Sequence, residues 1–173
     1  MNEGSIGGYW FLAKYRTSQS GHTPVDSRRR DTLKIKLVIT VNRPIDVVFD
    51  QIADARNEEK WNTSLTDYKL ISAGPIGKGS RFSYKNRGNA FASTLAEYDK
   101  PSYLAFHVHG EPMEIDARVD FKAIDPDTTT VSAEYAFKPK GLMKVLLPLF
   151  APVLRKAFAK EFGNFKSFSE TRK

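Results

Sequence analysis

The sequence has no cysteine, which excludes disulfide bonds and thiolate metal sites. It also has no uninterrupted apolar stretch of about 20 residues, the length that a membrane-spanning helix needs. Near the N-terminus the only apolar run is Tyr9–Ala13, which is too short for the core of a signal peptide. These absences favour a soluble protein of a reducing compartment, and we expect it in the cytoplasm.

Catalytic and metal-binding signatures are missing as well. There is no Gly-x-Ser-x-Gly nucleophile motif. The stretch 74–80 (GPIGKGS) has two residues instead of four before its Gly-Lys pair and leads into a strand pattern, so it predicts a hairpin turn and not a phosphate-binding loop. His107 and His109 share the outward face of a predicted strand, and no strong third ligand stands near them. We therefore expect neither a metal nor a cofactor.

What is present is the composition of one soluble domain: 173 residues, of which 40 % are hydrophobic and 27 % charged. The net charge of +7 lies mainly in residues 138–173, which hold nine Lys/Arg and two Asp/Glu. Such a segment can bind nucleic acid or an anionic membrane, or can be the solvated back of an amphipathic helix. We expect no nucleic acid, because the phenylalanines of this segment are not interleaved with its basic residues. Weak contact with an anionic membrane stays open.

The chain divides into two parts. Residues 1–32 have no sustained hydrophobic period and are rich in Gly, Ser, Thr and Arg, which predicts a disordered basic tail. Residues 33–173 are predicted to form the folded, ligand-binding domain.

Hydrophobic periodicity predicts an α+β fold for this domain. Apolar residues alternate over 33–41, as in a half-buried strand. Residues 44–53 change to a helical period, and a second short helix ends near Trp61. Six strand patterns follow, and a long helix completes the chain at 141–170. Because strands joined by short turns pair with their neighbours, we expect one curved seven-stranded antiparallel sheet wrapped around the C-terminal helix.

That helix should cover the apolar face of the sheet. On a helical wheel its leucines and phenylalanines fall on one side and its basic residues on the other. Pro148 and Pro152 each lack a backbone N–H and crowd the preceding turn, so the first part should be kinked or form a separate short helix. Glu161 falls inside the apolar band. Either it reaches a basic neighbour at the sheet edge, or it enters a cavity where burial would raise its pKa.

Four stretches, VNRPIDVVFDQIADARNEEKW, GPIGKGSRF, LAEYDKPSYLAF and LLPLFAPVLRKAFAKEFGNFKSF, follow one another in a characteristic order and spacing. On these stretches the chain from about residue 33 to 170 resembles the START/Bet v 1-like helix-grip superfamily (SRPBCC), in its polyketide cyclase/dehydrase and lipid-transport branch. The resemblance implies a deep apolar cavity between sheet and helix that holds lipids, sterols, polyketides or aromatic molecules. It supplies no universal catalytic residue.

Inward-facing positions and the resemblance together indicate candidate ligand-binding residues. Trp61 matches the tryptophan of the family's motif and would close one end of the cavity. Phenol groups of Tyr68, Tyr84 and Tyr135 could enter it as donors or acids, or could make only local hydrogen bonds. The candidate cavity-lining residues are Trp61, Phe82, Tyr84, Leu104, Phe106, Ala117, Val119, Tyr135, Phe150, Leu154, Phe158 and Glu161.

The leading hypothesis is a protein that binds or carries a small hydrophobic molecule. One alternative is an enzyme of the polyketide cyclase or dehydratase kind, which would use Tyr and Glu groups of the cavity for proton transfer. Another is a module that docks its basic C-terminal helix on a partner protein or an anionic membrane.

Overall fold

The computed structural model describes residues 32–171. The seven strands form one antiparallel sheet in the order β1-β7-β6-β5-β4-β3-β2. The predicted α+β fold, with two short helices after the first strand and a long helix at the end, is confirmed. The predicted disordered tail lies outside the described residues except for Thr32. The elements in chain order are β1 (Leu33–Val41), α1 (Ile45–Ala53), η2 (Ala55–Lys60), β2 (Leu65–Leu70), β3 (Arg81–Asn86), β4 (Asn89–Asp99), β5 (Tyr103–Gly110), β6 (Met113–Asp125), β7 (Thr128–Pro139) and α2 (Met143–Thr171).

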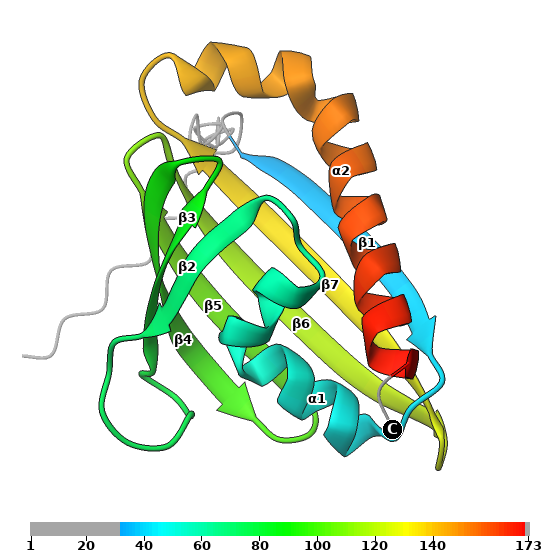
Figure 1. Cartoon of the computed structure of the whole chain (residues 1–173). Coiled ribbons are helices and arrows are strands. Elements are labelled where there is room, and N and C mark those ends of the chain that lie inside the picture. Colours follow the sequence, from blue (N-terminus) through cyan, green and yellow to red (C-terminus); the bar gives the residue numbers. More distant parts are fainter. Residues whose placement is uncertain (1–31, 172–173) are drawn as a thin grey trace, which may run out of the picture.

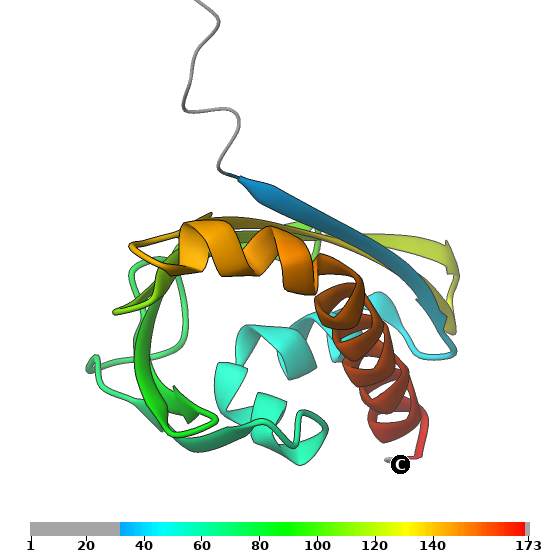
Figure 2. The same ribbon diagram turned by 90° about the horizontal axis from the view of Figure 1, so that it is seen from above.

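The sheet curves around the helices, and all three helices lie on its concave side (Figures 1 and 2). Alternation of side chains along the strands explains this arrangement. In β6, for example, Ala117, Val119 and Phe121 are buried, whereas Arg118 between them is exposed on the convex face. The concave face is therefore apolar and is covered by α1, η2 and α2, while the convex face meets water.

The main hydrophobic core lies where α1 and the C-terminal half of α2 meet the sheet. Phe49 of α1 is fully buried, and its ring centroid lies 5.2 Å from that of Tyr98 and 5.1 Å from that of Phe121. Phe162 and Phe165 of α2 belong to the same cluster. This packing closes one end of the space between sheet and helix.

Hydrogen bonds fix the C-terminal half of α2 to β1 and to the turn after it. Lys166 Nζ donates to the carbonyl of Thr40 at 2.7 Å, and Arg43 Nε donates to the carbonyl of Ser169 at 2.8 Å. The carboxylate of Glu170 accepts from a backbone N–H in the same turn at 2.8 Å. These bonds hold the last part of the domain against its first strand. As a result the helix lies over β1, an edge strand of the sheet that would otherwise be uncovered.

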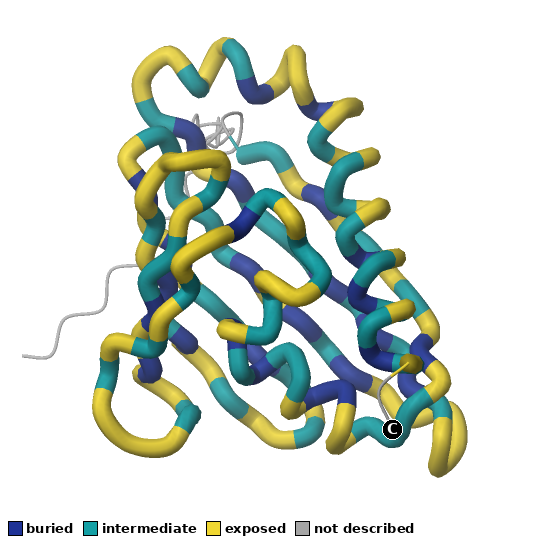
Figure 3. The backbone as a smooth tube through the Cα atoms, in the orientation of Figure 1, coloured by how far each residue is buried: buried dark blue, intermediate teal, exposed yellow. Residues whose placement is uncertain are grey.

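The N-terminal half of α2 is held less tightly. The helix is continuous but bends in the segment that contains Pro148 and Pro152 (Figures 1 and 2). The predicted kink is thus confirmed, and no separate helix forms. In this half only Leu147 and Ala151 are buried, as the mostly exposed tube of Figure 3 shows. Leu147 packs in a small second cluster with Ile35 and Phe137.

The outward face of α2 carries the predicted basic residues and, in its N-terminal half, apolar residues that were not predicted there. Lys144, Arg155, Lys156 and Lys160 are exposed, as predicted. Before Pro152 exposed apolar side chains lie there beside Lys144. Three residues at helical spacing, the first of them just before α2, form an apolar stripe with exposed fractions of 64–73 %: Leu142, Val145 and Leu149.

Candidate functional site

A cavity of about 530 Å³ lies between the concave face of the sheet and α2. Residues of η2 and of the segment after it close one side, and strands β2 to β7 supply the remaining wall. The side chains that line it are mainly apolar or aromatic. The volume falls within the 300–1,000 Å³ that is typical of small-molecule sites.

Three parallel aromatic rings form the wall on β2, β3 and β4. The ring centroids of Tyr68 and Tyr84 lie 4.5 Å apart with planes inclined by 10°, and those of Tyr84 and Phe91 lie 5.7 Å apart with planes inclined by 12°. Phe91 pairs with Gly110 of β5 across the sheet. A Cβ atom at Gly110 would lie 2.2 Å from Phe91 Cε1, so glycine is needed there for the ring to lie over the backbone.

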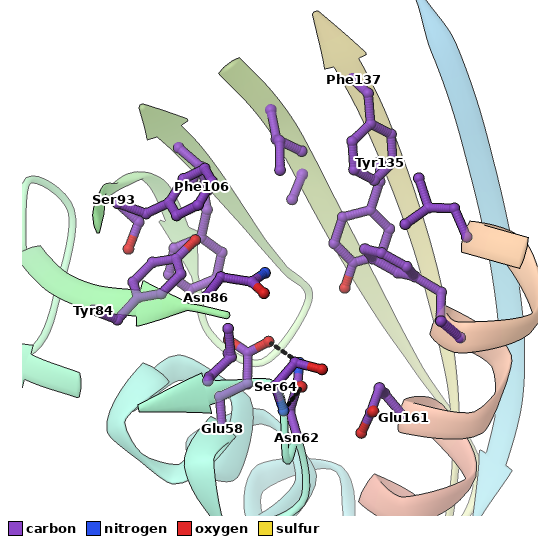
Figure 4. Close-up of a pocket in the computed structure, with 18 of the residues that line it drawn as sticks. Glu58, Asn62, Ser64, Tyr84, Asn86, Ser93, Phe106, Tyr135, Phe137 and Glu161 are labelled. Atoms are coloured by element: carbon purple, nitrogen blue, oxygen red, sulfur yellow. Dashed lines mark hydrogen bonds between the residues drawn. The ribbon is translucent and has the colours of Figure 1, made fainter. Parts of the chain in front are cut away.

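The opposite wall is formed by β7 and α2. Phe158 of α2 meets Tyr135 at a centroid distance of 4.8 Å and Phe137 at 5.5 Å, both edge to face. Burial raises the pKa of Tyr135 and of Tyr84 well above the ordinary value, so both phenols keep their protons at neutral pH. Figure 4 shows Tyr135 pointing its hydroxyl into the cavity from this wall.

Glu58 is the most strongly perturbed carboxyl group of the cavity. It stands in η2 three residues after Ala55 and three before Trp61, and all three line the cavity, because positions i and i+3 eclipse in a 3₁₀-helix. Burial raises the pKa of Glu58 to about 7, and the charge of Glu161 adds to this effect. Contacts with Asn62, whose Nδ2 donates at 3.4 Å, and with Tyr68 act in the opposite direction.

Glu161 lines the cavity from α2. Of the two alternatives that the sequence left open, this is entry into the cavity and not contact with a basic residue at the sheet edge. Its carboxylate accepts a hydrogen bond of 3.1 Å from Asn164 Nδ2, which also donates to the carbonyl of Trp61 at 3.1 Å. Within residues 32–171 this hydrogen bond comes from an amide and not from a basic side chain at the sheet edge. In Figure 4 it lies across from Asn62 and Glu58.

Several buried polar atoms on the cavity wall have no hydrogen-bond partner within residues 32–171. They are Gln51 Oε1, Trp61 Nε1 and Ser93 Oγ, of which Ser93 Oγ also lies close enough to the Tyr68 phenol to lower the pKa of that phenol. Ser93 is 3 % exposed. A buried polar group without a partner costs about 1–3 kcal/mol, so a molecule in the cavity that supplied these partners would recover part of that free energy.

The structure brings most of the predicted cavity residues together, but not Phe82 and Leu104. Phe82 is fully buried behind the ring of Tyr68, with their centroids 6.1 Å apart. Leu104 is fully buried in the core cluster of Phe49. The alternation of apolar and polar residues identified the inward face of both strands correctly. It did not show which inward side chains are separated from the cavity by another side chain. The predicted residues that line the cavity are Trp61, Tyr84, Phe106, Ala117, Val119, Tyr135, Phe150, Leu154, Phe158 and Glu161.

Nothing in the geometry of residues 32–171 forms a metal centre, since no group of three His, Cys, Asp or Glu side chains converges there. His107 and His109 are exposed on the convex face, where each lies beside a carboxylate: Nδ1 of His107 is 2.7 Å from Asp116, and Nδ1 of His109 is 3.3 Å from Glu114. No helix of the described chain is long and apolar enough to cross a membrane.

Glu58→Gln is expected to stabilise the protein at about pH 8 and to change little at about pH 4.5. A carboxyl whose pKa is higher in the folded than in the unfolded chain costs stability once it ionises. Here the cost begins above the ordinary value of 4.5 and levels off above about 7, and a shift of this size corresponds to about 3 kcal/mol. Urea unfolding at both pH values measures it. Glu111→Gln, in the exposed turn after β5, is the control, and equal stabilisation at both pH values would contradict the assignment.

The fold and cavity define a helix-grip protein: a curved antiparallel sheet that holds a long C-terminal helix, with an internal apolar space between them. The sequence profile of the family described as polyketide cyclase / dehydrase and lipid transport matches residues 32–170. The chain belongs to this family, as the resemblance of its four sequence stretches had indicated. No curated protein matches the sequence.

Solved structures of low sequence identity share the fold. The Zhui aromatase/cyclase from Streptomyces sp. R1128 superposes with a TM-score of 0.69 at 12 % identity, covering 82 % of this chain and 95 % of the other. Ara h 8.0201 gives 0.62 at 12 % identity, with 82 % and 99 % covered. A START superfamily protein from Mycobacterium smegmatis gives 0.58 at 14 % identity, with 73 % and 94 % covered. At these identities the likeness establishes the helix-grip fold alone.

Proposed function

We propose that the protein binds or carries a small hydrophobic molecule in the cavity between the sheet and α2. The observation that carries the proposal is the cavity itself, about 530 Å³ lined mainly by apolar and aromatic side chains. Close packing normally leaves few voids larger than a water molecule in a protein of this size. An apolar space of this volume is stable at little cost when an apolar molecule fills it.

A neutral fluorescent probe tests this proposal. N-phenylnaphthylamine is expected to bind the folded protein at one site with a Kd on the order of micromolar, with an increase in emission because its surroundings become apolar. Aromatic or long-chain alcohols should displace it. Native mass spectrometry of freshly purified protein would show whether a molecule is already bound. A folded protein that neither carries a ligand nor increases the probe's emission would contradict the proposal.

A second candidate function is docking on an anionic membrane, and the apolar stripe of α2 favours it. Contiguous exposed apolar side chains mark interaction surfaces, and the same helix continues beyond the bend into Arg155, Lys156 and Lys160, all exposed. Apolar residues that enter the headgroup region beside basic residues that meet anionic lipids are typical of helices that lie on a membrane. The inner side of this part of α2 lines the cavity, so docking would place the cavity next to lipid.

Vesicle sedimentation tests this candidate. The protein is expected to sediment with vesicles that contain about one third phosphatidylglycerol, and less with phosphatidylcholine alone or in high salt, because salt screens the basic residues. Leu149→Glu should reduce the bound fraction several-fold, since it places a carboxylate in the apolar stripe. Ile124→Glu, at an exposed position of β6, is the matched control. Equal binding by both variants, or none by the wild type, would contradict the candidate.

A further inference from the structure

The cavity has a polar end and an apolar end. Polar side chains from η2, β2, β3 and β4 gather on one side (Figure 4), where they include Glu58, Tyr84 and Ser93. The remaining wall on β5 to β7 and on α2 is apolar except for Tyr135 and Glu161. A purely hydrocarbon ligand would fill the apolar end but would leave the groups of the polar end without partners.

The groups at the polar end can bind an oxygen atom. Ser93 Oγ is buried and forms no well-aligned hydrogen bond, although it lies close enough to the phenol of Tyr68 to lower the pKa of that group. Trp61 Nε1 is an unpartnered donor on the wall. The phenol of Tyr84 stays protonated because burial and the nearby charge of Glu58 raise its pKa. Hydroxyl and indole N–H groups donate to a carbonyl or hydroxyl oxygen, so the polar end offers donors that a ligand oxygen would satisfy.

The charges around the cavity disfavour an anion. Glu58 lines it from η2 and Glu161 from α2, and the two carboxyls interact unfavourably when both are ionised. Arg87 is the one Lys or Arg side chain among the described residues of the wall, and it is exposed in the turn between β3 and β4. A carboxylate ligand at the polar end would meet like charge without a buried cation to balance it.

We propose that the cavity selects an uncharged apolar molecule that carries a ketone or hydroxyl oxygen, with that oxygen at the polar end beside Ser93, Tyr84 and Glu58, and that it discriminates against carboxylates. This inference rests on the proposed function and deepens it. It divides the hydrophobic molecules that would fit by volume into neutral alcohols, phenols and ketones, which bind, and fatty or aromatic acids, which do not.

Three nearly isosteric probes separate the contributions of the apolar surface, the ligand oxygen and the ligand charge to binding. They are isopropylnaphthalene, acetylnaphthalene and naphthoate. Isopropylnaphthalene reports the apolar cavity alone. Ser93→Ala is expected to weaken acetylnaphthalene binding about 3- to 10-fold, the worth of one hydrogen bond, and to change isopropylnaphthalene binding less than twofold. Tyr84→Phe, which keeps the ring stack, gives the same readout if Ser93→Ala does not fold. Ser83→Ala is the matched control, because Ser83 lies on β3 but does not line the cavity.

The pH dependence tests the part played by Glu58. Its protonated carboxyl donates to a ketone oxygen, whereas its ionised form does not, so acetylnaphthalene affinity should fall from about pH 5.5 to about pH 8.5 as the group with a pKa of about 7 loses its proton. Glu58→Gln should remove the fall. The groups that face Glu58 are Glu161 from α2, Asn62, and Tyr68 and Tyr84 from β2 and β3, of which the tyrosines stay neutral over this range.

Naphthoate is expected to bind at least 10-fold more weakly than acetylnaphthalene at about pH 8, as two like charges in a buried site require. Equal binding of these two probes would overturn the inference, and so would equal effects of Ser93→Ala and Glu58→Gln on acetylnaphthalene and isopropylnaphthalene. In either case isopropylnaphthalene binding would leave the proposed function standing. If no probe binds, isopropylnaphthalene included, the proposed function fails together with the inference.

Discussion

Phe49→Ala is expected to lower the free energy of unfolding by about 3–5 kcal/mol, the usual cost of truncating a buried phenylalanine. Phe49 is fully buried, and it joins α1 to the sheet through an edge-to-face contact with Tyr98 and a tilted ring contact with Phe121. Truncation would leave a void at the closed end of the molecule, where the surrounding strands cannot collapse. For a domain of this length the loss corresponds to a fall in Tm of about 10 °C or more.

Phe150→Ala is the matched control for this change. Phe150 is 56 % exposed on α2, so the same truncation removes little buried surface and should cost less than about 1 kcal/mol. Urea unfolding and thermal scans of the two variants measure the difference. Equal losses for both would mean that the packing of α1 on the sheet is not the main core of the domain.

Ala117→Trp is expected to reduce the affinity for N-phenylnaphthylamine by about 100-fold, which corresponds to about 2.7 kcal/mol, while the protein stays folded. Ala117 lies on β6 in the middle of the cavity wall, between Phe106 on β5 and Tyr135 on β7. An indole at this position would occupy space that a ligand needs. Overpacking normally destabilises a core, but here the added ring enters an existing cavity.

The control is Ala92→Trp, the same substitution at an exposed position of β4 that pairs with the outward-facing His109. It should leave the probe affinity within about twofold of the wild type. Fluorescence titration gives the affinity, and circular dichroism establishes that both variants are folded. A folded Ala117→Trp protein that binds the probe as tightly as the wild type would show that the ligand lies elsewhere.

The fold could be predicted from the sequence because its signals are local. Alternation in β1 and β6, the turn residues between strands and the change to a helical period each follow from neighbouring residues. Most of the cavity wall follows for the same reason, because inward faces are a property of each strand. Whether a given inward residue meets the cavity or the core depends on what lies over it, and this is why Phe82 and Leu104 were assigned wrongly to the wall.

At the polar end Tyr84 was predicted from the sequence, whereas Glu58 and Ser93 were not. Glu58 and Glu59 are adjacent in η2, and a wheel of 3.6 residues per turn does not describe a 3₁₀-helix. The three-residue spacing from Glu58 to Trp61 is the signal that would have found it. Tyr68 reaches Tyr84 because β2 is irregular between Thr66 and Lys69, where Asp67 has a φ of 60°, and no sequence pattern indicated that irregularity.

The order of the strands also constrains how the domain forms. β1 is synthesised first, but it pairs along its whole length with the last strand, β7. The pairs run from Leu33 with Phe137 to Val41 with Thr129. A ribosome adds residues one at a time, so β1 waits for about 100 further residues before it can pair. Contacts between segments this distant in the chain slow folding, and an unpaired strand is open to aggregation while it waits. Truncation before β7 would remove the partner of β1 and the helix α2 that follows, so partial chains should accumulate as insoluble protein.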